Sequence, residues 1–473
     1  MVNMNLVAMQ SNVYYRLYGD NVYLFNRRNW ASAFIKDVAA FKDFFTRHPV
    51  NIETIIHRIA LKYELLDETV EMDFHEVFDP LIADGYFVTG DRVELVDANE
   101  FKNTISPHKN TCLASDRVLG GSLEADDKDG HYEDALGELT KYFASYPTPF
   151  ELCIDLTRAC TERCVHCYVP GFQNVFLPYE VIEKVLSEFA VMGGLKVKLT
   201  GGECMLHPDF ERIVALARAH DMVISVLSNL TCCGLEKAQV MKDSGVAVVQ
   251  VSLYGMTPET HEAVTRVQGS LAKTLRGIEM LQKTGIPVQI HCPVLKQNVA
   301  GIDAVARYGR ERGMKTTFDA VMMSRADHGR NEACGLSDAE LRKFIEAQEE
   351  LPDKLPTCPD MDAAEHVCEI GTSKLCLSAE GKYYPCNGCY GLELGDCRKQ
   401  TLAEVWNDEP IKRLRALRMR DLSACRVCPN RMFCAPCPAR NFNANRDLTL
   451  PDAAMCKAAT CRRNIVEIRT KEN

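Results

Sequence analysis

The sequence predicts an α/β protein with three parts: a small N-terminal domain, a parallel sheet and a cysteine-rich C-terminal region. Three observations support this. Strand and helix patterns alternate from Phe150 to about Leu351. Two hairpins and three helical stretches occupy residues 1–100. Twelve of the 22 cysteines fall between Cys358 and Cys461. A chain of 473 residues is also too long for one ordinary domain.

The first 100 residues are predicted to form a small winged-helix domain. The segments Val13–Tyr18 and Val22–Phe25 flank Gly19-Asp20-Asn21 and indicate a hairpin. A second hairpin is expected around Thr89-Gly90-Asp91, and the helices are expected at 38–47, 52–65 and 70–84. A DNA-binding module is the ordinary interpretation of such a domain. These residues contain nine Lys and Arg against sixteen Asp and Glu, which makes DNA a poor partner.

Residues 101–147 are predicted to be a polar linker with some helix from Glu133 to Ala144. The segment contains Gly120-Gly121 and the run Asp126–Gly130, which are turn and loop signals. We therefore expect the following domain, over 148–351, to fold without residues 1–100, and the cysteine-rich region to occupy 352–473.

The alternation in the second domain predicts six parallel βα units. The expected strands are 152–156, 196–200, 223–227, 246–253, 288–294 and 316–322, and the expected helices between them are 179–191, 209–219, 235–244, 270–283 and 302–311. Six units can form an open three-quarter barrel or a doubly wound sheet. In either case ligands gather at the carboxyl ends of the strands.

A cysteine loop follows the first of these strands directly. Cys160, Cys164 and Cys167 lie within eight residues, with His166 beside the last. Three thiolates leave one iron of a 4Fe–4S cluster open, which suits catalysis better than a structural role. A zinc site that includes His166 is the alternative. It is less favoured, because neighbouring residues cannot easily reach one tetrahedral ion.

Composition narrows the class of protein. The formal charge of −10 argues against broad binding to nucleic acid or to anionic membranes. The sequence has no apolar run of membrane-spanning length, and its first ten residues lack the features of a secretory signal. We therefore expect a cytoplasmic protein, in which clustered cysteines hold metal more often than disulfides.

The Cys-x3-Cys-x2-Cys loop after the first strand resembles the signature of the radical S-adenosylmethionine (radical SAM) superfamily. The resemblance implies a TIM-like partial (β/α)6 barrel and a 4Fe–4S cluster on Cys160, Cys164 and Cys167. In this family the open iron chelates the methionine moiety of S-adenosylmethionine, and reductive cleavage yields a 5′-deoxyadenosyl radical. An electron donor such as flavodoxin or ferredoxin is implied as well.

A second element supports the resemblance. Thr200-Gly201-Gly202-Glu203 ends the second strand, and in the family a similar element holds the methionine ammonium. The resemblance implies further cofactor contacts at the ends of the next strands and beyond them, at Ser228, Asn229, Ser252 and Arg266. Turn capping or a surface charge is the alternative role for each of these four.

The C-terminal cysteines resemble the SPASM extension of radical enzymes that modify peptides. That extension binds two auxiliary 4Fe–4S clusters. Carried over, the pattern assigns one cluster to Cys368, Cys376, Cys386 and Cys437, and the other to Cys425, Cys428, Cys434 and Cys456. Two Cys-x2-Cys pairs taken alone would also fit a zinc ribbon.

The pattern departs from the family in several places. Two residues rather than three separate Cys434 from Cys437, and Cys461 competes with Cys456. Three further cysteines, Cys358, Cys389 and Cys397, have no assigned place, and each is a candidate to replace a cluster ligand or to act in catalysis. Asn387 stands where related sulfatase-activating enzymes have a basic aspartate, which makes formylglycine formation doubtful.

The order of the parts resembles that of maturases of ribosomally made peptides (RiPPs), in which a winged-helix recognition element binds a leader peptide as an added strand. We therefore expect a precursor peptide as partner, with its leader on residues 1–100. The expected product is a crosslink, first of all a thioether from a peptide cysteine to carbon, with carbon–carbon or carbon–oxygen bonds as the close alternative. A non-catalytic module with structural clusters is a distant third.

Overall fold

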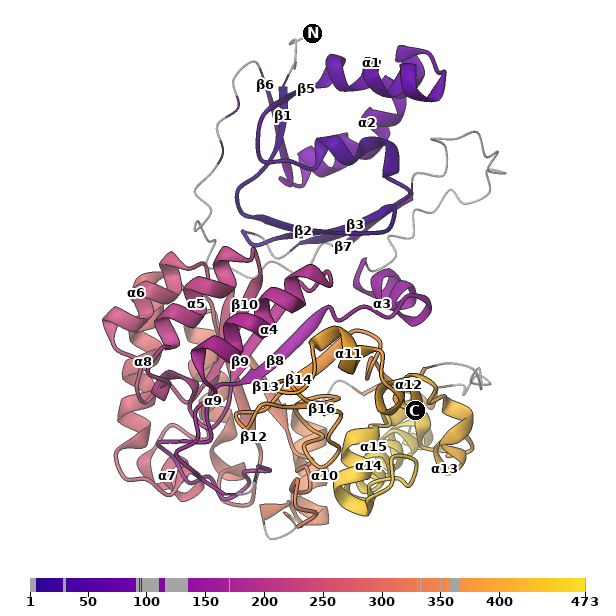
Figure 1. Cartoon of the computed structure of the whole chain (residues 1–473). Helices are drawn as coiled ribbons and strands as arrows, with labels where there is room; N and C mark the ends of the chain where they lie inside the picture. Colours follow the sequence, from indigo (N-terminus) through magenta and orange to yellow (C-terminus); the bar gives the residue numbers. More distant parts are fainter. Residues whose placement is uncertain are drawn as a thin grey trace.

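The computed structural model describes residues 6–28, 31–90, 93, 95, 110–114, 135–169, 171–329, 331, 334–348, 351–356 and 366–472. It contains an N-terminal domain with two small sheets, a parallel barrel-like sheet covered by helices, and a C-terminal region of short elements (Figure 1). Of the helices described, none is long and apolar enough to cross a membrane.

The N-terminal domain has two sheets with helices packed between them. One sheet has the strand order β2–β3–β4–β7 and the other β5–β1–β6. The elements are β1 Leu6–Met9, β2 Val13–Tyr18, β3 Asn21–Asn26, β4 Ser32–Lys36, the 3-10 helix Ala39–Phe44, β5 Val50–Asn51, α1 Ile52–Tyr63, α2 Asp67–Ala83, β6 Phe87–Gly90 and β7 Asn110–Ala114.

Several expectations for this domain are confirmed and others are wrong in detail. The first hairpin is β2–β3, paired antiparallel from Val13 to Tyr18. The stretch expected as a helix at 38–47 is only a short 3-10 helix. The first arm of the expected second hairpin is the strand β6, which pairs antiparallel with β1. Most of its second arm, 92–95, lies outside the described residues.

The segment expected as a linker, 101–147, takes part in the fold. The expected helix is α3, Ala135–Ser145, and its Leu139 and Phe143 are buried. The strand β7 was not expected from the sequence, and it pairs in parallel with β4 over five residues. The sequence did not predict this strand, because a short edge strand needs backbone partners rather than an apolar pattern.

The barrel strands follow one another in sequence order. They are β8 Glu151–Asp155, β9 Lys196–Thr200, β10 Val223–Ser228, β11 Val248–Ser252, β12 Val288–Pro293 and β13 Lys315–Asp319, all parallel. A doubly wound sheet would reverse the strand order at a switch point. The unbroken strand order therefore indicates a partial barrel rather than a doubly wound sheet.

Helices cover the outside of this sheet. They are α4 Tyr179–Val191, α5 Phe210–Ala219, α6 Leu235–Asp243, α7 Pro258–Thr265, α8 Ser270–Thr284, α9 Ile302–Glu311 and α10 Asp338–Gln348. Their apolar faces form one core with the strands, and Ile182, Phe189, Ile213 and Ile278 are fully buried in it. The sequence predicted five of these helices to within two residues, and α7 and α10 were not expected.

The C-terminal region joins the barrel sheet rather than standing apart from it. β14, Lys374–Leu377, pairs in parallel with β8, and β15 Lys382–Tyr384 and β16 Gly395–Asp396 extend the sheet. Four short helices and one long helix complete the described part of the region. The short ones are α11 Leu402–Trp406, α12 Glu409–Arg415, α13 Ser423–Arg426 and α14 Pro438–Asn445, and the long one is α15 Ala453–Glu472.

The N-terminal domain packs on the amino ends of the barrel strands. Tyr18 and Tyr23 meet Phe150 at ring-centroid distances of 6.4 and 5.4 Å, and Phe143 lies 5.4 Å from the same ring. Arg16 donates hydrogen bonds to the carbonyls of Gly194 and His220, both at 3.0 Å. Aromatic side chains of the two domains thus pack against each other at the amino ends of the strands, and the expectation that the barrel folds without residues 1–100 stays a prediction.

Candidate active site

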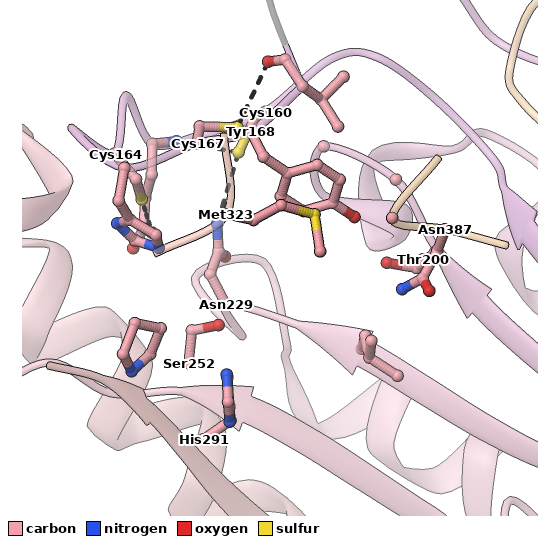
Figure 2. Close-up of a pocket in the computed structure, with 18 of the residues that line it drawn as sticks. Cys160, Cys164, Cys167, Tyr168, Thr200, Asn229, Ser252, His291, Met323 and Asn387 are labelled. Atoms are coloured by element: carbon pink, nitrogen blue, oxygen red, sulfur yellow. Dashed lines mark hydrogen bonds between the residues drawn. The ribbon is translucent and has the colours of Figure 1, made fainter. Parts of the chain in front are cut away.

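A cavity of about 510 Å³ opens at the carboxyl ends of the barrel strands. Each barrel strand contributes at least one side chain to the cavity wall, from its last residue or from within two residues of it. These residues are Asp155, Thr200, Ser228, Ser252, His291 and Asp319. Figure 2 shows Cys160, Cys164 and Cys167 at one side of this cavity and Thr200 and Asn387 at another.

The three cysteines of the loop lie close enough for their charges to interact. Burial raises the pKa of Cys160 to about 12, and the nearby Cys167 thiol adds to this effect. Burial also raises the pKa of Cys164 well above its usual range, with further contributions from Cys160 and Cys167. A metal must therefore displace these protons to bind, so cluster assembly here releases protons.

Glycines allow the second strand to reach this loop. A Cβ on Gly201 would lie 2.5 Å from the carbonyl oxygen of Thr157, and one on Gly202 would lie 2.3 Å from that of Ala159. Gly201 also has φ +137°, a conformation that favours glycine. The backbone N–H of Gly202 donates to Thr157 at 2.8 Å. The Gly-Gly turn thus supports the backbone that leads into Cys160.

Glu203 lies where the ends of β9 and β10 meet. Its carboxylate is fully buried and accepts hydrogen bonds from the Ser228 hydroxyl and the backbone N–H groups of Met205 and Asn229, at 2.8, 3.0 and 2.8 Å. Gly201 and Gly202 line the cavity, whereas Glu203 is not among its described lining residues. In this structure Glu203 joins the ends of β9 and β10.

The other expected cofactor contacts divide into two groups. Ser228, Asn229 and Ser252 line the cavity, and the Asn229 side-chain amide donates to the Thr161 hydroxyl at 3.0 Å. Arg266 is exposed and ends α7 with φ +56°, and it is not among the described lining residues. The structure therefore brings three of these four residues to the site.

The cavity wall also contains residues that sequence reasoning did not single out. Tyr168, Met323 and Arg440 line it, and Arg440 on α14 donates to Asp319 at 3.0 Å. Glu162 is buried beside Cys164, 3.4 Å from its sulfur, and burial raises the Glu162 pKa to about 7. In the sequence, only the position of Glu162 between two loop cysteines indicated that it belongs to the site.

His166 is half-buried and lines the same cavity, and its Nδ1 atom is buried without a hydrogen-bond partner. Burial lowers its pKa to about 4, so the imidazole is neutral at ordinary pH. Its ring meets the Tyr254 ring edge-on, with centroids 5.2 Å apart.

Most of the C-terminal cysteines gather as expected. Each pair among Cys425, Cys428, Cys434 and Cys456 interacts electrostatically, and burial with these neighbours raises the Cys434 pKa to about 11. Cys461 lies beside Arg342 and Glu346 instead.

The members of the other expected set do not all meet. Three of them, Cys368, Cys386 and Cys437, interact electrostatically with one another. Burial raises the Cys386 pKa to about 12, and the thiols of Cys437 and Cys368 contribute to the increase. Cys376 lies on β14 opposite Cys153 of β8. Cys358 lies outside the described residues.

The donor sets fit iron–sulfur clusters. Thiolates are the usual protein ligands of such clusters. The group of three cysteines faces the cavity and leaves room for a further ligand, whereas the C-terminal group Cys425, Cys428, Cys434 and Cys456 supplies four.

Comparison with known proteins agrees with this chemistry. Residues 154–309 match the radical SAM superfamily, and residues 368–429 match an iron–sulfur cluster-binding domain, SPASM. The chain is 26% identical over 326 residues to an AdoMet-dependent heme synthase of Methanosarcina barkeri, covering 62% of this chain and 92% of that protein. It is 26% identical over 314 residues to the antilisterial bacteriocin subtilosin biosynthesis protein AlbA of Bacillus subtilis, covering 64% and 70%.

The fold comparison extends over nearly the whole chain. The structure of Streptococcus suis SuiB bound to its precursor peptide SuiA matches with a TM-score of 0.61 at 14% identity, and covers 95% of this chain and 99% of that one. With the cysteine loop at the mouth of a partial barrel, these matches identify the chain as a radical SAM enzyme, which uses S-adenosylmethionine and 4Fe–4S clusters, with a C-terminal SPASM domain.

Proposed function

We propose that this enzyme is a maturase that crosslinks a ribosomally made precursor peptide. The observation that carries the proposal is the complete three-part fold, N-terminal domain included, which this chain shares with a protein solved in complex with its precursor peptide. Similarity to a bacteriocin biosynthesis protein supports it. The similarity to a heme synthase covers only 62% of this chain.

The residues of the mouth have separate tasks in this proposal. Cys160, Cys164 and Cys167 hold the catalytic cluster, and Cys425, Cys428, Cys434 and Cys456 hold one auxiliary cluster. Together with bound S-adenosylmethionine, the catalytic cluster would supply a 5′-deoxyadenosyl radical, and the auxiliary clusters would serve as electron acceptors.

The cavity wall orients the cofactor and the substrate. Ser228, Asn229 and Ser252 offer hydrogen-bonding groups at the ends of β10 and β11. Gly201 and Gly202 let backbone approach closely. Tyr168 and Met323 present apolar surface, which excludes water from a carbon radical.

The bond that we favour is a thioether between a peptide cysteine sulfur and carbon. Closing such a bond from a carbon-centred radical and a thiol removes one electron and one proton, and an auxiliary cluster is a suitable acceptor of the electron. Carbon–carbon or carbon–oxygen crosslinking is the alternative. Asn387 lines the cavity but lacks the carboxylate of the sulfatase-activating enzymes, which argues against formylglycine formation.

Peptide recognition is assigned to the N-terminal domain. Its sheets provide edges to which an extended leader can add as a strand. Among the residues that the structure describes, β7 pairs with β4 at one edge of its sheet, and no strand pairs with the outer side of β5 or β6. The edges of the β5–β1–β6 sheet are therefore the favoured sites.

The test uses anaerobically reconstituted holoenzyme, S-adenosylmethionine, a low-potential reductant and the short peptide encoded in the neighbouring reading frame. Mass spectrometry should show the loss of two hydrogen atoms per crosslink, with one 5′-deoxyadenosine formed for each. Alkylation then separates the bond types, because a thioether consumes a peptide thiol. Cofactor cleavage without any change in the peptide would contradict the proposal.

A further inference from the structure

The turn Cys386-Asn387-Gly388-Cys389 brings a further cysteine to the C-terminal thiols. The backbone N–H of Cys389 donates to the Cys386 carbonyl at 3.1 Å, which closes a tight Cys-x2-Cys turn. Cys389 is fully buried. Two cysteines at this spacing in a turn commonly hold one metal centre.

Helix α14 fixes this turn against another cysteine. Cys437 is the N-cap residue of the helix. Asn443, nearer its other end, donates from its side-chain amide to the Gly388 carbonyl at 2.7 Å. A Cβ on Gly388 would lie 3.7 Å from that of Ala439, in the first turn of α14. The turn therefore packs along the helix that carries Cys437.

Electrostatic interactions agree with this packing. The Cys389 thiol interacts electrostatically with the thiols of Cys386, Cys437 and Cys368. Those three thiols also interact with one another. The same kind of pairwise interaction is found in the group Cys425, Cys428, Cys434 and Cys456.

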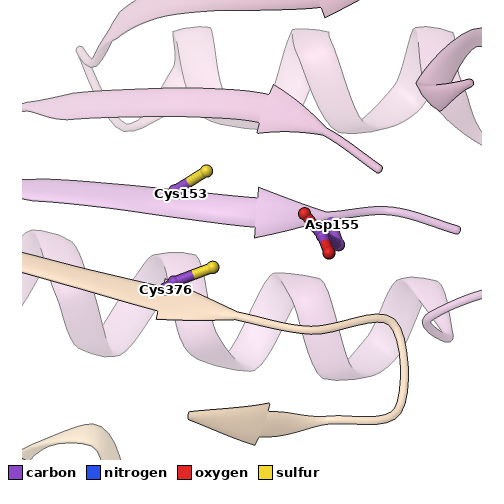
Figure 3. A group of neighbouring side chains, drawn as sticks. All are labelled: Cys153, Asp155 and Cys376. Carbon is purple, nitrogen blue, oxygen red and sulfur yellow. The ribbon is translucent and has the colours of Figure 1, made fainter. Parts of the chain in front are cut away.

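Cys376 has different neighbours. It lies directly opposite Cys153 in the parallel register of β14 and β8. Its sulfur, that of Cys153 and a carboxylate oxygen of Asp155 lie within 4.8 Å of one another (Figure 3). The Tyr390 hydroxyl is 3.6 Å from the Cys376 sulfur and donates to Asp155 at 2.5 Å. Cys376 therefore belongs to a buried group between the two strands.

We propose that Cys389, and not Cys376, is the fourth protein ligand of the auxiliary cluster that Cys368, Cys386 and Cys437 hold. The inference rests on the auxiliary clusters of the proposed function and concerns this one ligand set. Four protein thiolates leave no iron open, so this cluster accepts an electron and does not bind a peptide thiol. Cys153 and Cys376 then remain as free thiols.

The test compares three single variants of the full-length protein, C389A, C376A and C397A. Each is made in a background in which Cys160, Cys164 and Cys167 are alanine, so that only auxiliary clusters assemble. Cys397 serves as the matched control, because it is a buried cysteine of the same region that interacts electrostatically with Asp396, Arg398 and Lys184 rather than with thiols.

The readouts are iron and sulfide per chain and the Mössbauer and electron paramagnetic resonance spectra of the reduced clusters. C389A should lose about four of roughly eight irons, or show a three-iron or site-differentiated cluster. C376A and C397A should match the background protein. A loss of iron in C376A equal to or greater than that in C389A would overturn the assignment, as would an unchanged spectrum for C389A.

A second variant guards against misfolding of C389A. C389S keeps an oxygen donor at the same place, so it should keep its iron and change only the spectrum of one cluster, whereas C376S should change neither. If C389S has an unchanged spectrum, the ligand assignment is wrong. None of these measurements uses a peptide, so they separate this inference from the proposed function: a protein with Cys389 ligation and no peptide activity contradicts only the latter.

Discussion

The two ends of the barrel sheet are built from different kinds of residues. At the carboxyl ends, polar side chains and three thiols surround an open cavity. At the amino ends, aromatic residues such as Tyr18, Phe143 and Phe150 pack against one another and leave little exposed. The comparison teaches that one end is arranged for chemistry and the other for holding a second domain.

The separation has a consequence for the substrate. A strand of five residues spans roughly 17 Å at about 3.3 Å per residue. In the proposed function, a leader held on the N-terminal domain would lie at least one strand length from the cavity. The core peptide would then need a spacer of at least about five extended residues to reach the cavity.

The largest expected effect comes from removing the thiols of the mouth. Replacing Cys160, Cys164 and Cys167 by alanine should abolish reductive cleavage of S-adenosylmethionine and remove about four irons per chain. The auxiliary clusters should still assemble, because their cysteines lie on other segments. Chromatographic assay of 5′-deoxyadenosine and iron analysis measure both effects. Cofactor cleavage by the triple variant would refute the assignment of the catalytic cluster.

The second effect concerns the opposite end. Phe143→Ala should lower the free energy of unfolding by about 3–5 kcal/mol, because it removes a buried ring that meets Tyr18 and Phe150. Thermal denaturation measures this. The exposed Tyr146, which directly follows the same helix, is the control, and its replacement by alanine should change stability by less than about 0.5 kcal/mol. Equal effects of the two substitutions would mean that the interface is not a packed core.

A smaller effect is expected from the turn that supports the cysteine loop. Gly202→Ala places a methyl group against the Ala159 carbonyl, and such overpacking costs about 1–3 kcal/mol. We expect 5′-deoxyadenosine formation to fall roughly 10–100-fold. The control is Gly234→Ala, since a Cβ there meets no atom within 4 Å. Activity that survives Gly202→Ala unchanged would show that the loop tolerates displacement.

The smallest effect should separate two predicted cofactor contacts. Ser252→Ala removes a hydroxyl from the cavity wall and should raise the KM for S-adenosylmethionine roughly tenfold, the cost of about one hydrogen bond. Arg266→Ala should change it less than about twofold, because Arg266 is exposed beyond the cavity. Steady-state kinetics with varied S-adenosylmethionine decide this. A larger effect at Arg266 would mean that the loop after α7 closes over the cofactor.

Prediction from sequence was accurate where the signal is local. The strand Lys196–Thr200 and the helices Tyr179–Val191 and Ile302–Glu311 have the bounds that the hydrophobic pattern predicted. It was poor where pairing is long-range. The pairing of β6 with β1, the addition of β7 to β4 and the addition of β14 to the barrel depend on backbone partners far away in the chain.

The sequence by itself determined the chemistry of the mouth. One short loop contains Cys160, Cys164 and Cys167, so no distant segment is needed to bring them together. Gly201 and Gly202 lack side chains, which indicates that another part of the backbone approaches them closely. Contiguous residues carry that information because their spacing limits where they can lie.

Tertiary structure alone decided which distant groups meet. It placed the Glu203 carboxylate between two strands rather than in the cavity, left Arg266 outside, and grouped Cys389 rather than Cys376 with Cys437. Cys376 and Cys389 are both buried cysteines of the same region, so composition and spacing do not separate them. The register of β14 against β8 does, because it turns Cys376 toward Cys153 and leaves the turn at Cys389 to pack along α14.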